Sequence, residues 1–281
     1  MRVVVVGGTG QLGRELLRAL PAAATMAPSR AELDLTDAPA VAARLAALVP
    51  AAVVNAAADN RVDAAEADPA ASHAVNTLGV AALAAACRAT GAYLVQLGTD
   101  YVFDGRAGRP YTEDDAPNPL GAYARSKLEG ERLARELAPR HAVVRVAGLY
   151  AAGGAGFVDR VLARARAGER LRVVADQVTG PTWARDVARA LARLLPRLVA
   201  GDAPGGIYHM TNAGACSWYE FACAALALAR VDAEVEPITS AELGARAPRP
   251  PYSVLANTRL AAIGEPPLRH WRDALAAYLA D

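Results

Sequence analysis

The sequence has almost no lysine. Lys127 is the only lysine in the 281-residue chain, and arginine supplies the rest of its 30 basic residues. Arginine would serve at an ordinary surface position, because both side chains carry a positive charge. The two differ where a compact ammonium group on a flexible stem is needed. Lys127 follows Tyr123 by four residues, a spacing that places both on one face of a helix.

Cysteine is also scarce. The three cysteines, Cys87, Cys216 and Cys223, are an odd number without paired spacing, which argues against a disulfide framework. No cluster of histidine and cysteine accompanies them in the sequence. We therefore predict inert thiols and no metal site at these positions.

Long apolar runs and an excess of one charge are missing as well. No uninterrupted apolar stretch reaches the roughly 18 residues that span a bilayer, and no signal-peptide pattern opens the chain. The formal net charge is +1, so neither nucleic acid nor a membrane is expected as a partner. We expect a cytoplasmic protein that is a monomer or a homodimer.

What the sequence has instead is an alternation of apolar strands with helices. Apolar segments predict buried strands at 3–6, 51–58, 92–99, 141–147 and 206–212. Helices are predicted at 12–20, 72–90, 123–137, 157–167 and 186–198, and a turn at 177–183. This order predicts an α/β fold with a Rossmann-like, doubly wound parallel sheet in residues 1–148. Residues 149–281 are expected to form mainly a smaller substrate-binding lobe, with some segments returning to the main sheet.

A glycine-rich turn follows the first predicted strand. Its sequence, GGTGQLG, has the spacing G-x-x-G-x-x-G and opens a helix, which is the context of a dinucleotide site. Glycines let the backbone approach a pyrophosphate, and the helix N-terminus attracts its charge. The alternative is a purely structural turn. We predict that a nicotinamide dinucleotide contacts Gly7, Thr9, Gly10, Gln11, Leu12 and Gly13.

The end of the second predicted strand bears on which dinucleotide is bound. The segment PSRAELDLTD (28–37) contains Ser29 and Arg30. An acid there would bind the ribose 2′-hydroxyl, whereas an arginine accommodates a 2′-phosphate. The segment therefore favours NADPH as the cofactor, with NADH as the alternative. Asp34 and Leu35 are the next candidates, for contacts to the adenine.

Thr99 ends a predicted parallel strand, at the edge where open α/β sheets place their ligands. With Tyr123 and Lys127 it makes a predicted proton-transfer site. A tyrosine has a pKa of about 10, and a neighbouring ammonium group would lower it. The ammonium group can also hold the ribose hydroxyls of a nicotinamide cofactor, while Thr99 would hydrogen-bond the substrate oxygen as charge develops. The alternative for Tyr123 and Lys127 is a pair on an exposed helix.

Taken together, these motifs resemble the dTDP-4-dehydrorhamnose reductase family of the extended short-chain dehydrogenase/reductase superfamily. The resemblance is carried by GGTGQLG, LDLTD, NAAADNRVDAAE, TDYVFDG, YARSKLEGE, DQVTGPT and RPPYSVL. It implies NADPH-dependent reduction of the C4 ketone of a nucleotide-linked deoxy sugar, with dTDP-4-dehydro-L-rhamnose as the first candidate and dTDP-L-rhamnose as its product. Tyr123 would donate the proton, Lys127 would tune Tyr123, and Thr99 would complete the catalytic set.

The same resemblance implies further contacts. Asn55, Ala56 and Ala57 would border the cofactor, and Asn76 would support Lys127 through a water molecule. The predicted substrate contacts come from three segments and are Val62, Asp63, Thr99, Asp100, Tyr101 and Gly148.

Several positions depart from the family pattern. Gly98 precedes Thr99 where serine is usual, and Gly148 stands where tryptophan commonly packs against the sugar. Another dTDP-4-keto sugar is therefore an alternative substrate. Glu15 matches the relatives that dimerise through a glutamate-bound metal, but Arg185 replaces a second glutamate, so no metal is predicted. The remaining alternatives are a non-catalytic, NADP-binding regulatory subunit and an epimerase with permanently bound cofactor.

Overall fold

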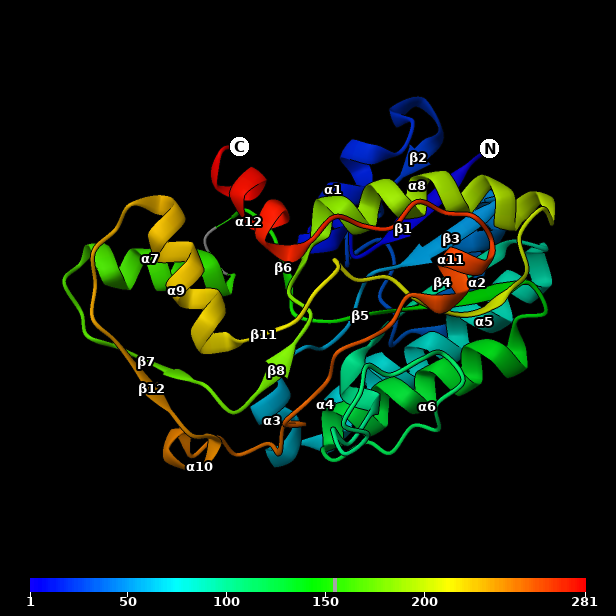
Figure 1. Cartoon of the computed structure of the whole chain (residues 1–281). Helices are drawn as coiled ribbons and strands as arrows, with labels where there is room; N and C mark the ends of the chain where they lie inside the picture. The colour runs from blue at the N-terminus through cyan, green and yellow to red at the C-terminus, as the bar shows by residue number, and fades with distance from the viewer. Residues whose placement is uncertain (154–155) are drawn as a thin grey trace.

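The computed structural model describes residues 1–153 and 156–281 and is drawn in Figure 1. Its centre is a six-stranded parallel sheet with the strand order β10-β5-β4-β3-β1-β2. In chain order the strands are β1 (Val3–Val6), β2 (Thr25–Met26), β3 (Ala52–Asn55), β4 (Tyr93–Thr99), β5 (His141–Val146) and β10 (Gly206–His209). The predicted α/β fold with a doubly wound parallel sheet is confirmed.

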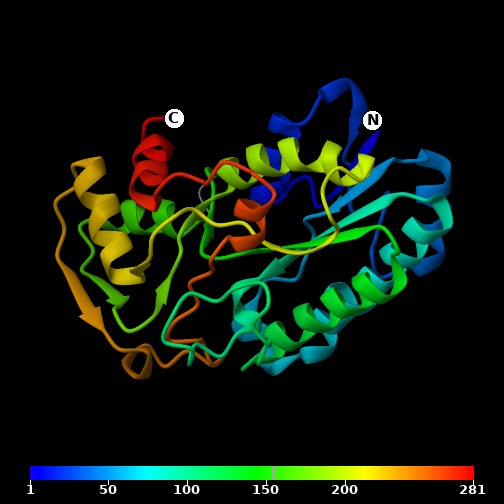
Figure 2. The same cartoon turned by 45° about the vertical axis from the view of Figure 1, so that its right-hand side comes forward.

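Both faces of the sheet are covered by helices. Val3 and Val5 belong to the core on one face, and Val4 and Val6 to the core on the other, because strand side chains alternate. Figure 2 shows one helical layer above the sheet and one below it. A strand buried on both sides needs no polar face, which explains the four consecutive valines. The first face is covered by α1 (Gln11–Ala19) and α8 (Ala184–Ala200), the second by α2 (Ala38–Leu48), α5 (Gly79–Thr90) and α6 (Ala122–Leu137).

The helix predicted at 72–90 is longer than expected. It begins with α4 (Pro69–His73), passes through the π-helical turn η2 (Ala74–Leu78) and continues as α5. Asp68 starts it, since its carboxylate accepts a hydrogen bond from the Ala71 amide at 3.4 Å and proline follows at the first helical position. By length and composition alone, Pro69–Thr90 would suffice to cross a membrane. In the fold it packs between α2 and α6, as a core helix does.

A smaller lobe lies beside the sheet, at the left in Figure 1. It contains three two-stranded sheets: β6 (Leu149–Tyr150) with β9 (Thr182–Trp183), β7 (Leu171–Val174) with β12 (Val235–Ile238), and β8 (Val178–Thr179) with β11 (Cys216–Ser217). Its core is rich in aromatic side chains from the helices α7 (Phe157–Arg166), α9 (Trp218–Ala229) and α12 (Trp271–Leu279). The shorter helices are η1 (Ala22–Ala24), α3 (Val62–Ala67), η3 (Asp100–Val102), α10 (Ser240–Leu243) and α11 (Thr258–Ala262).

Segments of the second half return to the main sheet. Strand β10 pairs with β5, and α8 packs on the sheet beside α1. The prediction of a simple turn at 177–183 is wrong, because β8 and β9 lie on either side of Gly180 and Pro181. Each of these short strands is formed by pairing with a partner that is distant in sequence. The strand predicted at 51–58 ends at Asn55, whose side-chain oxygen accepts a hydrogen bond from the Ala57 amide at 3.1 Å.

Candidate active site

The ends of three parallel strands meet at one edge of the sheet. The register pairs Val6 of β1 with Asn55 of β3, while β4 runs further, to Thr99. Open α/β sheets bind their ligands beyond these carboxyl ends. The glycine turn, the loop after β3 and Thr99 therefore come together although they are far apart in the sequence.

The glycine turn after β1 leaves no room for side chains at two positions. Gly7 has a φ of +81°, and a Cβ on it would lie 2.6 Å from the Ala57 amide nitrogen. A Cβ on Gly13 would lie 2.1 Å from the Gly7 carbonyl oxygen. At the start of α1, Gly10 has no side-chain cap and the first turn has no acidic residue. The positive end of the helix is therefore available to an anion.

The predicted contacts within this turn differ in what they can offer a cofactor. Thr9 is exposed and Gln11 is half-buried, so their side chains can reach a ligand. The side chain of Leu12 is buried in the core shared with α8. Only the backbone of Leu12 is therefore free to contact a dinucleotide.

The segment after β2 presents an exposed arginine. The side chain of Arg30 is 81% exposed, and its Nε pairs with the Asp34 carboxylate at 3.3 Å. The Ser29 hydroxyl donates to the Glu32 carboxylate at 2.8 Å, and hydrogen bonds from Ser29 lower the pKa of Glu32. Leu35 is buried in the core. Glu32 is an acid beside the predicted phosphate-binding pair that sequence reasoning missed.

Thr99, Tyr123 and Lys127 converge between β4 and α6. All three side chains are buried, with relative exposures of 7%, 8% and 5%. The Tyr123 hydroxyl donates to the Asn60 side-chain oxygen at 3.3 Å, and a hydrogen bond with Thr99 acts on the same phenol. Lys127 Nζ donates to the Leu97 carbonyl oxygen at 2.7 Å. The pair of Tyr123 and Lys127 is therefore not an exposed helix surface.

The protonation of these groups is governed mainly by burial. Burial raises the pKa of Tyr123 and lowers the pKa of Lys127 to about 8. The expected lowering of the Tyr123 pKa by Lys127 stays a prediction, because burial dominates the pKa of Tyr123 in the chain by itself and the hydrogen bond with Thr99 only partly offsets it. The ammonium group of Lys127 binds the Leu97 carbonyl oxygen. Tyr123 thus holds its proton at neutral pH, as a proton donor must.

The loop after β3 is fastened by two asparagines. Asn55 Nδ2 donates to the Gln96 side chain at 2.8 Å, so this amide is used within the sheet. Asn76, in the π-helical turn, donates to Ser126 at 3.1 Å and to the Asp59 carbonyl at 3.0 Å. Asn76 therefore ties this loop to the neighbour of Lys127. Its predicted support of Lys127 itself through a water stays a prediction.

A carboxylate that sequence reasoning missed caps the helix bearing Tyr123. Glu66 of α3 accepts a hydrogen bond from the Ala122 amide, at the first turn of α6. A Cβ on Gly121 would lie only 2.6 Å from the Glu66 carboxylate. A negative charge at this position also complements the helix dipole. Glu66 lies within the recognised segment NAAADNRVDAAE, but only the fold shows which helix it meets.

The predicted substrate residues surround Tyr123 from two directions. Val62 of α3 and Tyr101 of η3 pack in one small cluster with Tyr123, and the two tyrosine rings meet edge-on at 6.1 Å. Asp63 pairs with Arg249 of the proline-rich loop at 2.8 Å, which lowers the pKa of Asp63. Sequence reasoning missed Arg249, although it begins the motif RPPYSVL that carried part of the family resemblance.

Asp100 joins the sheet to the smaller lobe. Its buried carboxylate accepts hydrogen bonds from Thr99 at 3.2 Å and from Thr179 at 3.5 Å, and interacts with the hydroxyl of Ser253. Burial raises the pKa of Asp100 to about 6 despite these bonds. The carboxylate faces hydroxyl groups rather than open solvent, so a direct contact with substrate stays a prediction.

Gly148 lies against the turn between β8 and β9. Its φ is +50°, and a Cβ there would lie 3.1 Å from Pro181 Cα and 3.3 Å from Thr179 Cγ2. A tryptophan on this backbone would adopt an unfavourable left-handed conformation and displace the turn. The backbone conformation and the packing around Gly148 therefore suit glycine rather than the tryptophan expected from the family pattern.

Glu15 is held by arginines. Its buried carboxylate pairs with Arg185 at 3.0 Å and with Arg18, and Arg185 also pairs with Asp281. In the part of the chain that the structure describes, no group of three or more histidine, cysteine or acidic residues is placed to hold a metal ion. The position of the family glutamate is thus filled by an intramolecular ion pair.

A doubly wound sheet, a glycine turn at its carboxyl edge and a buried threonine, tyrosine and lysine define a dinucleotide-dependent oxidoreductase of the short-chain dehydrogenase/reductase class. More narrowly, the chain belongs to the family described as RmlD substrate binding domain, whose model matches residues 1–281.

Individual relatives agree with this assignment. The chain is 47% identical to the dTDP-4-dehydrorhamnose reductase of Streptomyces griseus, covering 98% of this chain and 91% of the relative. It is 41% identical to the "Probable dTDP-4,6-dihydroxy-2-methyloxan-3-one 4-ketoreductase" of Streptomyces antibioticus, covering 98% and 93%. The structure of the dTDP-4-dehydrorhamnose reductase of Bacillus anthracis in complex with NADP superposes with a TM-score of 0.94, at 31% identity and 99% and 98% coverage.

Proposed function

We propose that this chain is an NADPH-dependent reductase of the C4 ketone of a nucleotide-linked 4-keto-6-deoxy sugar, with dTDP-4-dehydro-L-rhamnose as the first candidate. The observation that carries the proposal is the convergence of Thr99, Tyr123 and Lys127 at the carboxyl edge of the sheet, beside the glycine turn. The names of the relatives and the NADP bound to the Bacillus anthracis structure support it.

The glycine turn suits the dinucleotide. Backbone groups occupy the space that a Cβ on Gly7 or Gly13 would take, so a pyrophosphate can approach the start of α1 closely. Arg30 would hold the 2′-phosphate, and the residues after β3, Asn55–Ala57, would border the cofactor. When bound, the reduced nicotinamide supplies the hydride that the carbonyl carbon receives.

The chain's own residues complete the reaction. Tyr123 donates its phenolic proton to the oxygen that gains charge, so that the ketone becomes an alcohol. Thr99 hydrogen-bonds the same oxygen. Lys127 stabilises the phenolate that Tyr123 leaves behind and holds the ribose of the cofactor. We propose a monomer or a homodimer that acts in the cytoplasm without a nucleic-acid or membrane partner.

A second candidate is reduction of another dTDP-4-keto sugar. Gly148 favours it, because an aromatic side chain is missing where the family commonly packs one against the sugar. Val62, Asp63, Asp100 and Tyr101 would then contact a sugar of different substitution. The similarity to a differently named Streptomyces antibioticus ketoreductase supports this candidate.

The test is a turnover assay with purified protein. NADPH is mixed with enzymatically prepared dTDP-4-dehydrorhamnose, and in parallel with other dTDP-4-keto sugars, while absorbance of the reduced nicotinamide is followed. We expect oxidation of NADPH with at least one sugar and slower turnover with NADH. Absence of turnover with every sugar would exclude the reductase, while stoichiometric cofactor that survives purification and is recycled would indicate an epimerase.

A further inference from the structure

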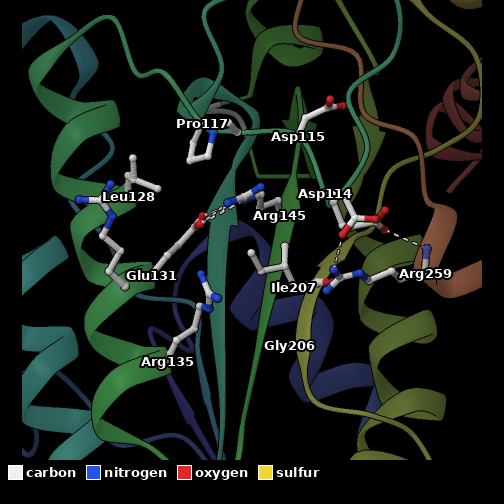
Figure 3. Close-up of a pocket in the computed structure, with 13 residues that line it drawn as sticks. Asp114, Asp115, Pro117, Leu128, Glu131, Arg135, Arg145, Gly206, Ile207 and Arg259 are labelled. Atoms are coloured by element: carbon white, nitrogen blue, oxygen red, sulfur yellow. Dashed lines mark hydrogen bonds and ion pairs between the residues drawn. The ribbon is translucent and has the colours of Figure 1, made fainter.

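A buried ion pair lies behind Lys127. Glu131 follows Lys127 by one turn of α6, and its carboxylate accepts hydrogen bonds from Arg145 of β5, from Nη2 at 2.8 Å and from Nε at 3.0 Å. Each of the two side chains is 2% exposed. Figure 3 shows the pair bridging the helix and the strand, at the wall of a cavity of about 430 Å³. This ion pair lies outside the site residues that the sequence predicted.

Gly98 provides the space that the carboxylate occupies. It lies opposite Arg145 in the sheet, and a Cβ on it would be 2.3 Å from Glu131 Oε1 and 2.9 Å from Arg145 Cγ. Lys127 Nζ binds the carbonyl oxygen of the preceding residue, Leu97. Lys127 and Glu131 therefore reach the same short piece of β4 from one face of α6. A serine at position 98, as expected from the family pattern, would collide with the Glu131 carboxylate, which explains the glycine there.

The carboxylate opposes the effect of burial on Lys127. Burial lowers the pKa of Lys127 to about 8, and the charge of Glu131 acts in the opposite direction. A buried ammonium group without a nearby counter-charge is unfavourable and tends to lose its proton. Among the described residues, Arg145 Nη1 has no hydrogen-bond partner. Buried ion pairs are by themselves weak evidence for a contribution to stability.

We propose that Glu131 is a positioning residue that keeps Lys127 in its charged form, with Arg145 and Gly98 fixing where its carboxylate lies. The importance of that charge rests on the proposed function, in which Lys127 acts on Tyr123 and on the cofactor ribose.

Other titratable groups lie on the elements around α6 but meet different partners. Asp59 pairs with Arg61, Glu66 caps α6, and Asp100 binds hydroxyl groups. His73 of α4 and Arg88 of α5 are exposed. Tyr101 and Tyr123 also face the site, and both are neutral at physiological pH because burial raises their pKa values.

The single lysine makes a direct test available. Protein produced with ¹³C-labelled lysine has one lysine side chain to observe by NMR, so the titration of its Cε signal gives the pKa of Lys127 without cofactor or substrate. Glu131→Gln retains the size of the side chain and removes its charge. We expect this variant to lower the Lys127 midpoint by about one pH unit, as loss of a nearby opposite charge does.

A second acidic residue provides the matched control. Glu113 is also buried and lines the same cavity, but it accepts hydrogen bonds from the His209 and Arg259 amides. Glu113→Gln should leave the Lys127 midpoint unchanged. If Glu131→Gln fails to fold because Arg145 is left unpaired, Glu131→Gln/Arg145→Met removes both charges and should still lower the midpoint.

The possible outcomes separate this inference from the proposed function. An unchanged Lys127 midpoint in the folded Glu131 variant, or in the double variant, overturns the inference even when the wild type reduces the sugar. A wild type without turnover overturns the proposed function but leaves the titration readable. Where turnover is measured, the alkaline limb of the kcat/KM profile for NADPH, which reports ionisations of the free enzyme, should move to lower pH in Glu131→Gln by about the same amount as the midpoint.

Discussion

The predicted cofactor side and the predicted substrate side of the candidate site are each stabilised by a different kind of contact. On the cofactor side, backbone packs against backbone, as where a Cβ on Gly13 would lie 2.1 Å from the Gly7 carbonyl. On the substrate side, side chains reach across the chain, as where Asp63 pairs with Arg249, 186 residues away. Side chains can be exchanged without altering the backbone, whereas close backbone contacts cannot. The substrate side is therefore where specificity can change while the dinucleotide chemistry is kept.

In the proposed mechanism, the reduction depends on the phenol of Tyr123. Replacement of Tyr123 by phenylalanine should lower kcat by about a thousandfold, because the proton donor is lost, while NADPH binding stays nearly intact. The measurements are NADPH oxidation and a fluorescence titration with NADPH. Tyr111→Phe is the control, since Tyr111 is also buried but its hydroxyl binds Asp104. Full turnover by the Tyr123 variant would remove this residue from the mechanism.

The free energy of unfolding should depend on pH through Asp100, which joins the sheet to the smaller lobe. Its pKa is raised from 3.8 to about 6 in the folded chain, so the folded state binds the proton more tightly than the unfolded state. Its contribution to stability is therefore greatest at low pH and declines as the pH rises through about 6.

This decline can be isolated with Asp100→Asn. The unfolding free energy of the wild type relative to the variant should fall by about 2 kcal/mol between about pH 4.5 and pH 7.5. Urea denaturation at a series of pH values measures it. A difference that stays constant across this range would show that Asp100 ionises normally.

The backbone packing on the cofactor side is tested by Gly13→Ala. The added methyl group meets the Gly7 carbonyl, so we expect destabilisation by about 2 kcal/mol and weaker binding of NADPH. Gly10→Ala is the control for stability, because its Cβ would lie 3.3 Å from the same oxygen. Thermal unfolding compares the two variants, and NADPH titration measures binding by Gly13→Ala. Equal effects would mean that the close approach at Gly13 is unimportant.

The smallest effect is expected on the substrate side. Asp63→Asn breaks the partly exposed pair with Arg249 and should raise KM for the sugar about fivefold, with the dissociation constant of NADPH unchanged. Asp115→Asn breaks a comparable pair with Arg109, in a loop that none of the predicted substrate contacts shares. An equal rise of KM in both variants would indicate general destabilisation of the fold rather than a local role of Asp63 in sugar binding.

The alternating strands and helices could be predicted because each element carries its own pattern. The four valines of β1 and the spacing of Tyr123 from Lys127 are local features. The short strands β8 and β9 could not be predicted in this way, because two residues have no periodicity and pair only once the lobe is assembled. The role of Glu66 as a cap of α6 could not be predicted either, because it depends on the docking of α3 against that helix.

By itself, the sequence determined the class of fold and the glycine turn and indicated Thr99, Tyr123 and Lys127 as candidate site residues, since each of these features depends on neighbours along the chain. Only the tertiary structure decided what surrounds them. It placed the Glu131 carboxylate in the space beside Gly98, paired Arg185 with Glu15 and packed Gly148 against Pro181. These contacts follow from strand register and from the docking of distant loops, which no local pattern encodes. The single lysine is a feature of the sequence, whereas the proposed relation between Lys127 and the Glu131 carboxylate depends on the fold.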